Sequence, residues 1–509
     1  MKNKSSYDEI DSLSLLAHKV APRVFDISSR QVNVSIRDQM VRAQQLVRDL
    51  RRADPAANRV LVIGMGVAGM TAALSACESG FAQVCALDAA GQPFALFKGV
   101  HSRYVGPFMY EWPSSFHADQ TYPTHYDTPW KSCASGLLAW QSKDPLSADD
   151  FGKALEASLK DRLQALADAG KSTPSMQVNI KRVAVQKYLK GYAHHGYLDW
   201  KASRDKTVAP GPRPTLDAKK LGGNAWGNPH GAQLPLLLEP DYIILAAGMG
   251  LETNKIPRVT HGQTPSFWRD DTLKDDGIAN AHVVVLGGGD GAMQDALRSL
   301  TIFHHPLSFI RHLECTAEVK TLLHAELPEL LSADRQMRQH NSWSSDVRGF
   351  AMVDAACKSA AERLAASPDV REAVRTTLRS GSGHVLLLVR GAHFDKAYLL
   401  NRFVAYLLDS CVSRLSASPH MGFSLEFGKQ VIQHSAAGKT GANGSVKIRP
   451  TGGGKTQERR ADHVVVRFGI APKSIRGLQM VQLRDPNAPG ADSRQRTTLS
   501  RVELPFVVM

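Results

Sequence analysis

Short apolar runs alternate with amphipathic helical patterns over most of this 509-residue chain. An apolar run of roughly four to eight residues between turn signals is typical of a buried strand, whereas apolar residues spaced three and four apart indicate a helix. We predict strands on this basis at 60–63, 84–87, 176–187, 241–250, 283–286, 307–310, 384–391 and 461–472. We predict helices at 36–50, 151–167, 293–300 and across the polar segment 317–380.

The order of these elements indicates the fold class. Strands that alternate with helices favour an α/β protein with parallel sheets. A chain of this length exceeds one hydrophobic core and is expected to divide into domains. We therefore predict two Rossmann-like dinucleotide-binding domains, at 59–255 and 256–509, with an N-terminal helical prefix at 1–58. The second domain is expected to carry a helical insertion at about 317–380 and closing strands near its C-terminal end.

A glycine-rich turn of the form GxGxxG follows the first predicted strand, in the segment from Gly64 to Gly69. The first glycine makes a tight turn, the second lets a pyrophosphate approach the backbone, and the third lets the helix pack on the strand. The helix, which continues to about Glu78, offers its N-terminal N–H groups to the phosphates. Asp88 ends the next strand, where a carboxylate can accept hydrogen bonds from a ribose. Gly64, Gly66, Gly69 and Asp88 are thus predicted to bind a dinucleotide, the alternative being a turn without a ligand.

A second turn of this kind, of the form GxGxxA, runs from Gly287 to Ala292. Gly287, Gly289 and Ala292 are expected to bind a second dinucleotide. If 307–310 is the next strand, Arg311 ends it, as many positions after the first glycine as Asp88 is in the first unit. An acid there favours a free ribose 2′-hydroxyl and a cation favours a 2′-phosphate. We therefore favour NADPH over NADH at this site; the alternative is that Arg311 is a solvated surface charge.

The chain is basic, with a formal net charge of +14 and a pI of about 9.5. This balance permits anionic ligands, nucleic acid or an acidic membrane as partners, but a generally basic, soluble surface is the favoured explanation. Because no DNA- or RNA-binding motif accompanies the basic clusters, we do not expect a nucleic-acid partner.

Cysteine usage and the N-terminus bear on the compartment. None of the 6 cysteines forms a CxxC pair, which fits a reducing compartment and gives neither a disulfide framework nor a zinc site. The N-terminal residues lack the apolar core of a signal peptide, and no apolar run is as long as a membrane span. We therefore expect a cytoplasmic protein without a bound metal.

These features resemble the flavoproteins with two dinucleotide-binding domains, a superfamily that includes disulfide reductases, ferredoxin reductase-like enzymes and flavin monooxygenases. The matching residues are Gly64, Gly66, Gly69 and Asp88 for FAD, the strand end Ala246-Ala247-Gly248, Gly287, Gly289 and Ala292 for the nicotinamide cofactor, and the closing strand end from Arg467 to Pro472. The resemblance implies that FAD binds in the first domain and NADP (or NAD) in the second. It also implies that NAD(P)H reduces the FAD, which then passes electrons on.

The chain departs from this superfamily at three points. No redox cysteine pair follows Asp88, so a disulfide reductase is not expected. The Gly-Asp segment that helps to hold the flavin in many relatives is not evident after Pro472. The monooxygenase fingerprint FxGxxxHxxxW is also absent, although the segment from Phe97 to His101 resembles half of it.

An aromatic segment at 97–117 is expected to approach the flavin ring, as the corresponding segment does in the superfamily. We predict that Arg103, Tyr110 and Trp112 line the flavin or substrate pocket. Aromatic rings can stack on the isoalloxazine, and a cation near its pyrimidine edge would stabilise the reduced flavin. The alternative is that Tyr110 and Trp112 pack in the core beneath a long loop.

The leading functional prediction is an FAD-dependent NAD(P)H oxidoreductase that passes electrons to a small-molecule acceptor or to oxygen. One alternative is a flavin-dependent monooxygenase or an amine or amino-acid oxidase. A second alternative, from a different class, is a flavin-bound regulatory or nucleic-acid-associated protein. No catalytic residue is predicted.

Overall fold

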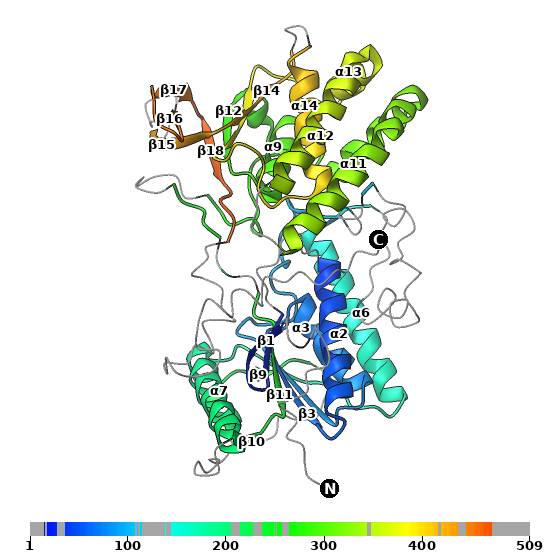
Figure 1. Cartoon of the computed structure of the whole chain (residues 1–509), viewed down its shortest axis with the longest axis vertical. Helices are drawn as coiled ribbons and strands as arrows, with labels where there is room; N and C mark the ends of the chain where they lie inside the picture. The colour runs from blue at the N-terminus through cyan, green and yellow to red at the C-terminus, as the bar shows by residue number, and fades with distance from the viewer. Residues whose placement is uncertain are drawn as a thin grey trace.

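The computed structural model describes residues 15, 18–27, 36–106, 109, 112–113, 138, 144–204, 214–227, 237–248, 250, 252–256, 264–343, 348–415, 419–435 and 444–470. Two sheets dominate the fold, each in its own half of the molecule (Figure 1). The chain has a mixed α/β architecture with two Rossmann-like domains, as the alternation of strands and helices predicts.

The first domain is built on a seven-stranded sheet of order β1-β2-β11-β3-β4-β7-β9. Its central strands β2, β11, β3, β4 and β7 are parallel, and β1 and β9 pair antiparallel at its two edges. The strands are β1 (Lys19–Ala21), β2 (Val24–Asp26), β3 (Arg59–Ile63), β4 (Gln83–Leu87), β7 (Ser175–Val178), β9 (Asn224–Ala225) and β11 (Tyr242–Leu245).

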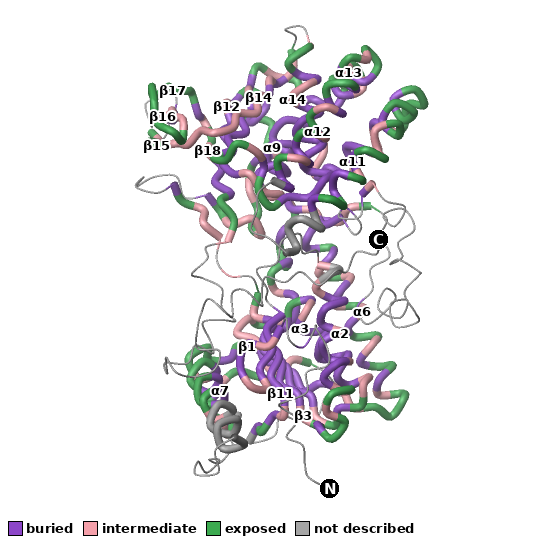
Figure 2. Tube along the Cα trace, viewed as in Figure 1, coloured by how far each residue is buried: buried purple, intermediate pink, exposed green. Residues whose placement is uncertain are grey.

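Helices cover both faces of this sheet, because successive strand residues point to opposite sides. Val60 and Val62 of β3 join the core formed with α2 (Ile36–Ala53), α3 (Val67–Glu78) and α6 (Ala148–Asp168). Leu61 and Ile63 face α7 (Arg182–Arg204) instead. Figure 2 shows the buried strands between these helices. Five short elements complete the domain: β5 (Tyr104–Val105) paired with β6 (Leu146–Ser147), β8 (Leu216–Asp217) paired with β10 (Leu237–Leu238), and α8 (Ala218–Leu221), which follows β8.

The second domain has a four-stranded parallel sheet of order β14-β13-β12-β18. Helices α9 to α14 pack on one face, and an antiparallel three-stranded sheet, β15-β16-β17, covers the other through Val446 and Ile448. The strands are β12 (His282–Leu286), β13 (His384–Val389), β14 (Gly422–Phe427), β15 (Lys429–Ser435), β16 (Ser445–Pro450), β17 (Gln457–Arg460) and β18 (His463–Val466). The helices are η1 (Asp276–Asn280), α9 (Asp290–Leu300), α10 (Pro306–Leu313), α11 (Ala317–Trp343), α12 (Arg348–Ala366), α13 (Pro368–Arg375) and α14 (Leu399–Val412).

Several predicted elements are confirmed. Helix α2 covers the predicted helix at 36–50, α6 covers the one at 151–167, and α11 to α13 form the helical insertion expected at about 317–380. The N-terminal prefix also contributes β1 and β2 to the first sheet, which the sequence analysis did not predict. In the described part of the chain, no helix is long and apolar enough to cross a membrane.

Two strand predictions are wrong. The segment 307–310 is not a strand: it lies inside α10, where Pro306 stands in the first turn and the His305 side chain caps the N-terminus. Proline suits the first helical turn because its missing N–H has no intrahelical acceptor there. The segment 176–187 is a strand only as far as Val178, and α7 begins at Arg182.

The cap of α10 predicts acid sensitivity. His305 Nδ1 accepts a hydrogen bond from the Leu307 N–H, and burial, aided by the charge of Arg311, lowers the pKa of His305 to about 3. The unfolded state therefore binds a proton at this site below about pH 6.5 while the folded state does not. We expect the free energy of unfolding to fall by at most about 1.4 kcal/mol per pH unit from this group as the pH drops from about 6.5 towards 3.

Denaturant unfolding between pH 8 and pH 4.5 measures this contribution. His305→Asn retains a capping side chain that does not titrate, so its unfolding free energy should depend less steeply on pH than that of the native protein. Equal slopes for the two proteins would contradict the assignment.

Candidate dinucleotide-binding sites

The first glycine-rich turn joins β3 to α3 and is shaped by close backbone contacts. Gly64 has a φ of +109°, and a side chain there would collide with the carbonyl oxygen of Ala246, just after β11. A side chain on Gly69 would collide with the Gly64 carbonyl. Both positions therefore require glycine for the turn and for the packing of α3 on β3.

Gly66 differs from these two glycines because no atom lies within 4 Å of the position that a Cβ would occupy. Gly66 is also the N-cap of α3, it has no side-chain cap, and the first turn of this helix holds no acidic residue. The N-terminal amides of α3 therefore face an open position that suits an anion.

Asp88 lies beside this turn, as predicted. One of its carboxylate oxygens accepts a hydrogen bond from the Met65 N–H at 2.6 Å, and the other accepts one from Ala90 at 2.8 Å. The carboxylate is thereby fixed at the carboxyl end of β4, next to the open position at Gly66. Gly248, with a φ of +82°, is exposed shortly after β11, the other neighbour of β3.

The second turn repeats this arrangement between β12 and α9. A side chain on Gly287 would collide with the Arg467 carbonyl, just after β18, as one on Gly64 would with the carbonyl after β11. Ala292 stands in place of the third glycine, with its Cβ 3.1 Å from the position a Gly287 Cβ would take. Gly289 has less open space than Gly66, since the carbonyl oxygen of Lys396 lies 3.5 Å from its Cβ position.

The strand register corrects the residue predicted to recognise the second ribose. Ile63, just before the first turn, pairs with Leu87, whereas Leu286, just before the second turn, pairs with Leu388. The structural counterpart of Asp88 is therefore Val389, which is buried, and the exposed Arg390 follows it.

Arg311 is not at this position. It lies in the last turn of α10 and forms an ion pair with Asp144. The prediction that Arg311 ends the second strand of this unit is thus wrong, because helices α10 to α13 separate α9 from β13.

Of the residues predicted to line a flavin pocket, the structure describes Arg103 and Trp112, and both contact the second domain. Trp112 is buried in the core of the second domain and stacks on Phe403 of α14 with ring centroids 5.4 Å apart. Arg103 is 1% exposed and pairs with carboxylates of the second domain. Tyr110 falls outside the described residues.

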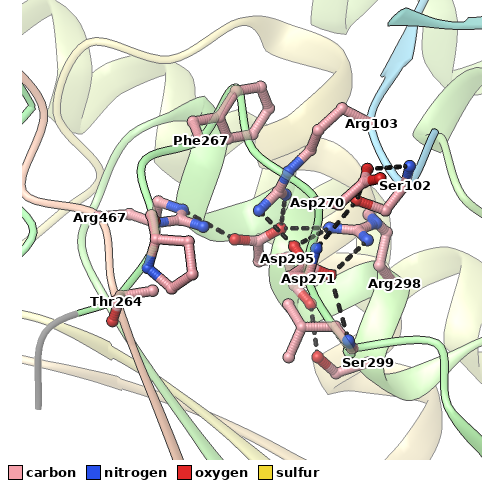
Figure 3. Close-up of polar contacts among 12 residues, drawn as sticks. Ser102, Arg103, Thr264, Phe267, Asp270, Asp271, Asp295, Arg298, Ser299 and Arg467 are labelled. Carbon is pink, nitrogen blue, oxygen red and sulfur yellow. Dashed lines mark hydrogen bonds and ion pairs between the residues drawn. The ribbon is translucent and has the colours of Figure 1, made fainter. Parts of the chain in front are cut away.

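Arg103 belongs to a buried ion cluster that the sequence analysis did not predict (Figure 3). Its members are three arginines and two aspartates, with side chains at most 9% exposed: Arg103, Asp271, Asp295, Arg298 and Arg467. Burial acts to raise the pKa of Asp295, but the surrounding arginines, Arg103 and Arg467 foremost, outweigh it and hold that pKa below its usual value. No motif signals such a cluster, because Arg103 and Asp295 are 192 positions apart in the chain.

Among the described residues no metal site is found, and two cysteines of the first domain are poorly suited to thiol chemistry. They contain no group of three or more His, Cys, Asp or Glu side chains that could hold a metal ion. Cys77 and Cys85 are unpaired and buried, and burial raises the pKa of each thiol to about 12. A thiolate nucleophile at either position is therefore disfavoured.

Comparison with known proteins adds little to this description. No family model and no curated protein sequence matches the chain. Among solved structures, thioredoxin reductase of Lactococcus lactis in its FR conformation aligns with a TM-score of 0.33 at 11% identity, over 81% of this chain and 77% of that one. Thioredoxin reductase of T. acidophilum also aligns with a TM-score of 0.33 at 11% identity, over 87% of this chain and 95% of that one. FprA of Mycobacterium tuberculosis in complex with NADPH aligns with a TM-score of 0.31 at 11% identity, over 81% of this chain and 70% of that one.

Proposed function

We propose that this chain is an NAD(P)H-dependent flavoprotein oxidoreductase, with FAD in the first domain and NAD(P)H in the second. The observation that carries the proposal is the open position at Gly66, flanked by the N-terminus of α3 and by the fixed carboxylate of Asp88. When bound, FAD would accept a hydride from NAD(P)H and pass the two electrons to a small molecule or to oxygen.

The first turn has a separate role for each of its groups. Gly66 lets the pyrophosphate approach the backbone, and the free amides of α3 donate hydrogen bonds to it. Asp88, at the end of β4, accepts a hydrogen bond from the Met65 N–H and presents its carboxylate to the adenosine ribose. Gly248 follows the adjacent strand β11, at the same edge of the sheet as the first turn, and lets the dinucleotide approach the backbone because it has no side chain.

The second turn supports a nicotinamide dinucleotide with a 2′-phosphate. Where the first unit has Asp88, this unit has Val389, whose side chain cannot accept a hydrogen bond from a ribose 2′-hydroxyl. The exposed cation of Arg390 follows directly and suits a phosphate dianion. Arg390 therefore takes the role that the sequence analysis gave to Arg311, and NADPH is the favoured donor.

Replacing Arg390 with glutamate should reverse the cofactor preference. Arg390→Glu removes the partner of the 2′-phosphate and adds a repelling charge, so the kcat/KM ratio of NADPH to NADH should fall about 10- to 100-fold, or roughly 1.4 to 2.7 kcal/mol. Steady-state kinetics with both donors measures the ratio. Arg311→Glu is the matched control and should leave it unchanged; a shift with Arg311→Glu alone would contradict the register argument.

The proposal as a whole is tested by the absorbance spectrum of the purified protein, with and without added FAD. We expect flavin bands that bleach under anaerobic conditions when NADPH is added. A protein that takes up no FAD is not a flavoprotein, and one whose flavin is bleached by neither NADPH nor NADH has no nicotinamide donor.

A further inference from the structure

The buried ion cluster joins the two domains through one side chain. Arg103 lies between the first Gly-rich turn and α6, and its carbonyl accepts a hydrogen bond from Ala148 at the start of α6. Its guanidinium reaches Asp295 on α9 and lies 2.5 Å from Asp271. Arg103 is thus held by the first domain at its backbone and by the second domain at its charged end (Figure 3).

The carboxylates that Arg103 contacts belong to the framework of the second turn. Asp295 lies in α9 and pairs with Arg467, whose carbonyl is packed against Gly287. The Arg103 guanidinium carbon lies over the Phe267 ring, 4.5 Å from the ring centroid. The Phe267 ring also lies against Gly291 in the first turn of α9. Arg103 is therefore linked, through Asp295 and Phe267, to residues that shape the second dinucleotide turn.

The charges of the cluster show that Arg103 is the added member. The positive charges of Arg298 and Arg467 balance the negative charges of Asp271 and Asp295. All four residues belong to the second domain, in which Arg467 directly follows β18. Arg103 brings a surplus positive charge into this buried set. Since burying an uncompensated charge is costly, its presence is not explained by the stability of the second domain alone.

We propose that Arg103 is a positioning residue that fixes the orientation of the two domains, and with it the approach of the nicotinamide to the flavin. This inference rests on the proposed function for its kinetic part. Other contacts between the halves, such as the stacking of Tyr104 on His304 at 4.6 Å and the bonds from His101 and Ser102 to Asp270, keep the domains associated. The ion pairs of Arg103 select one orientation among those that these contacts and the buried Trp112 allow.

Two variants of the same cluster separate positioning from stability. Arg103→Met removes the surplus charge, leaves the remaining two arginines and two aspartates balanced, and breaks the bridge between the domains. Arg298→Met also removes one buried arginine and leaves a balanced set, but breaks only contacts within the second domain. Arg103→Lys restores the charge without the two-pronged geometry of the guanidinium.

The orientation is measured by pulsed electron paramagnetic resonance between spin labels on Lys160→Cys of α6 and Lys358→Cys of α12, with Cys133 and Cys315 replaced by serine. Both lysines are exposed, on helices of different domains. The kinetic consequence is measured by stopped-flow reduction of the bound flavin at saturating NADPH, together with FAD content and the NADPH Kd.

We expect Arg103→Met to broaden or shift the label distance and to slow flavin reduction about 10- to 100-fold, with FAD content and the NADPH Kd unchanged, because a misplacement of about 1 Å can cost that much. Arg298→Met should change neither readout, and Arg103→Lys should recover part of both. Equal effects of Arg103→Met and Arg298→Met would overturn the proposal, as would native distances and rates in Arg103→Met. A protein without FAD would refute the proposed function, while the label distances would still decide whether Arg103 orients the domains.

Discussion

We expect the Gly66→Trp protein to fold normally and to bind no FAD. Gly66 has a φ of −73° and a ψ of −174°, a conformation open to any residue, and no atom lies within 4 Å of its Cβ position. A tryptophan side chain can therefore extend from the turn without displacing other residues. It would occupy the space that the pyrophosphate requires.

The expected loss of FAD affinity is at least about 100-fold, or roughly 2.7 kcal/mol. It is measured by titrating the apoprotein with FAD, and the thermal unfolding of the apoprotein should match that of the native chain. Gly191→Trp is the matched control, because Gly191 is exposed on α7 and also has no atom within 4 Å of its Cβ position. Full FAD uptake by Gly66→Trp would show that the pyrophosphate does not bind at this turn.

Gly64 provides the opposite case and shows why the choice of glycine matters. Its positive φ and its contact with Ala246 mean that Gly64→Ala strains the turn itself. Loss of FAD in that variant would not distinguish a binding defect from a folding defect. The structure thus shows a steric constraint on the turn at Gly64 that is absent at Gly66.

The sequence predicts the parts of each unit that are local. A strand, a glycine-rich turn and a helix follow one another within about 20 residues, so the turns at Gly64 and Gly287 could be placed from their spacing alone. Asp88 was found in the same way because β4 directly follows α3. In the second unit, however, α10 to α13 intervene before β13, and the apolar residues of α10 were taken for the missing strand.

The remaining site residues depend on contacts that sequence spacing does not encode. The pairing of β12 with β13 identifies Val389 and Arg390 as the counterparts of the Asp88 region, and this parallel pairing is not local. One signal for a helix at 306–313 was present in the sequence, since Pro306 suits the first helical position. No comparable signal marked the partners of Arg103, and that residue was assigned to the flavin because its segment approaches the ring in the superfamily.

The largest effect on stability is expected from Asp295→Asn. Asp295 is completely buried and contacts all three arginines of the cluster, so its loss leaves Asp271 as the cluster's one remaining carboxylate. Breaking a buried ion pair in this way typically costs about 3–5 kcal/mol. Chemical denaturation at pH 7 should show a decrease of this size, whereas Asp161→Asn, which removes an exposed carboxylate from α6, should have little effect.

Two further measurements connect this effect to the cluster's charge. Because the pKa of Asp295 is lowered in the folded protein, its contribution is present above the unfolded pKa of about 3.9 and is lost as the pH falls further. The difference between native and Asp295→Asn proteins should therefore shrink below about pH 4. Adding Arg103→Met to Asp295→Asn returns the cluster's net charge from +2 to the native +1 and should recover part of the lost stability. Strictly additive losses in the double variant would mean that Arg103 and Asp295 are not energetically coupled.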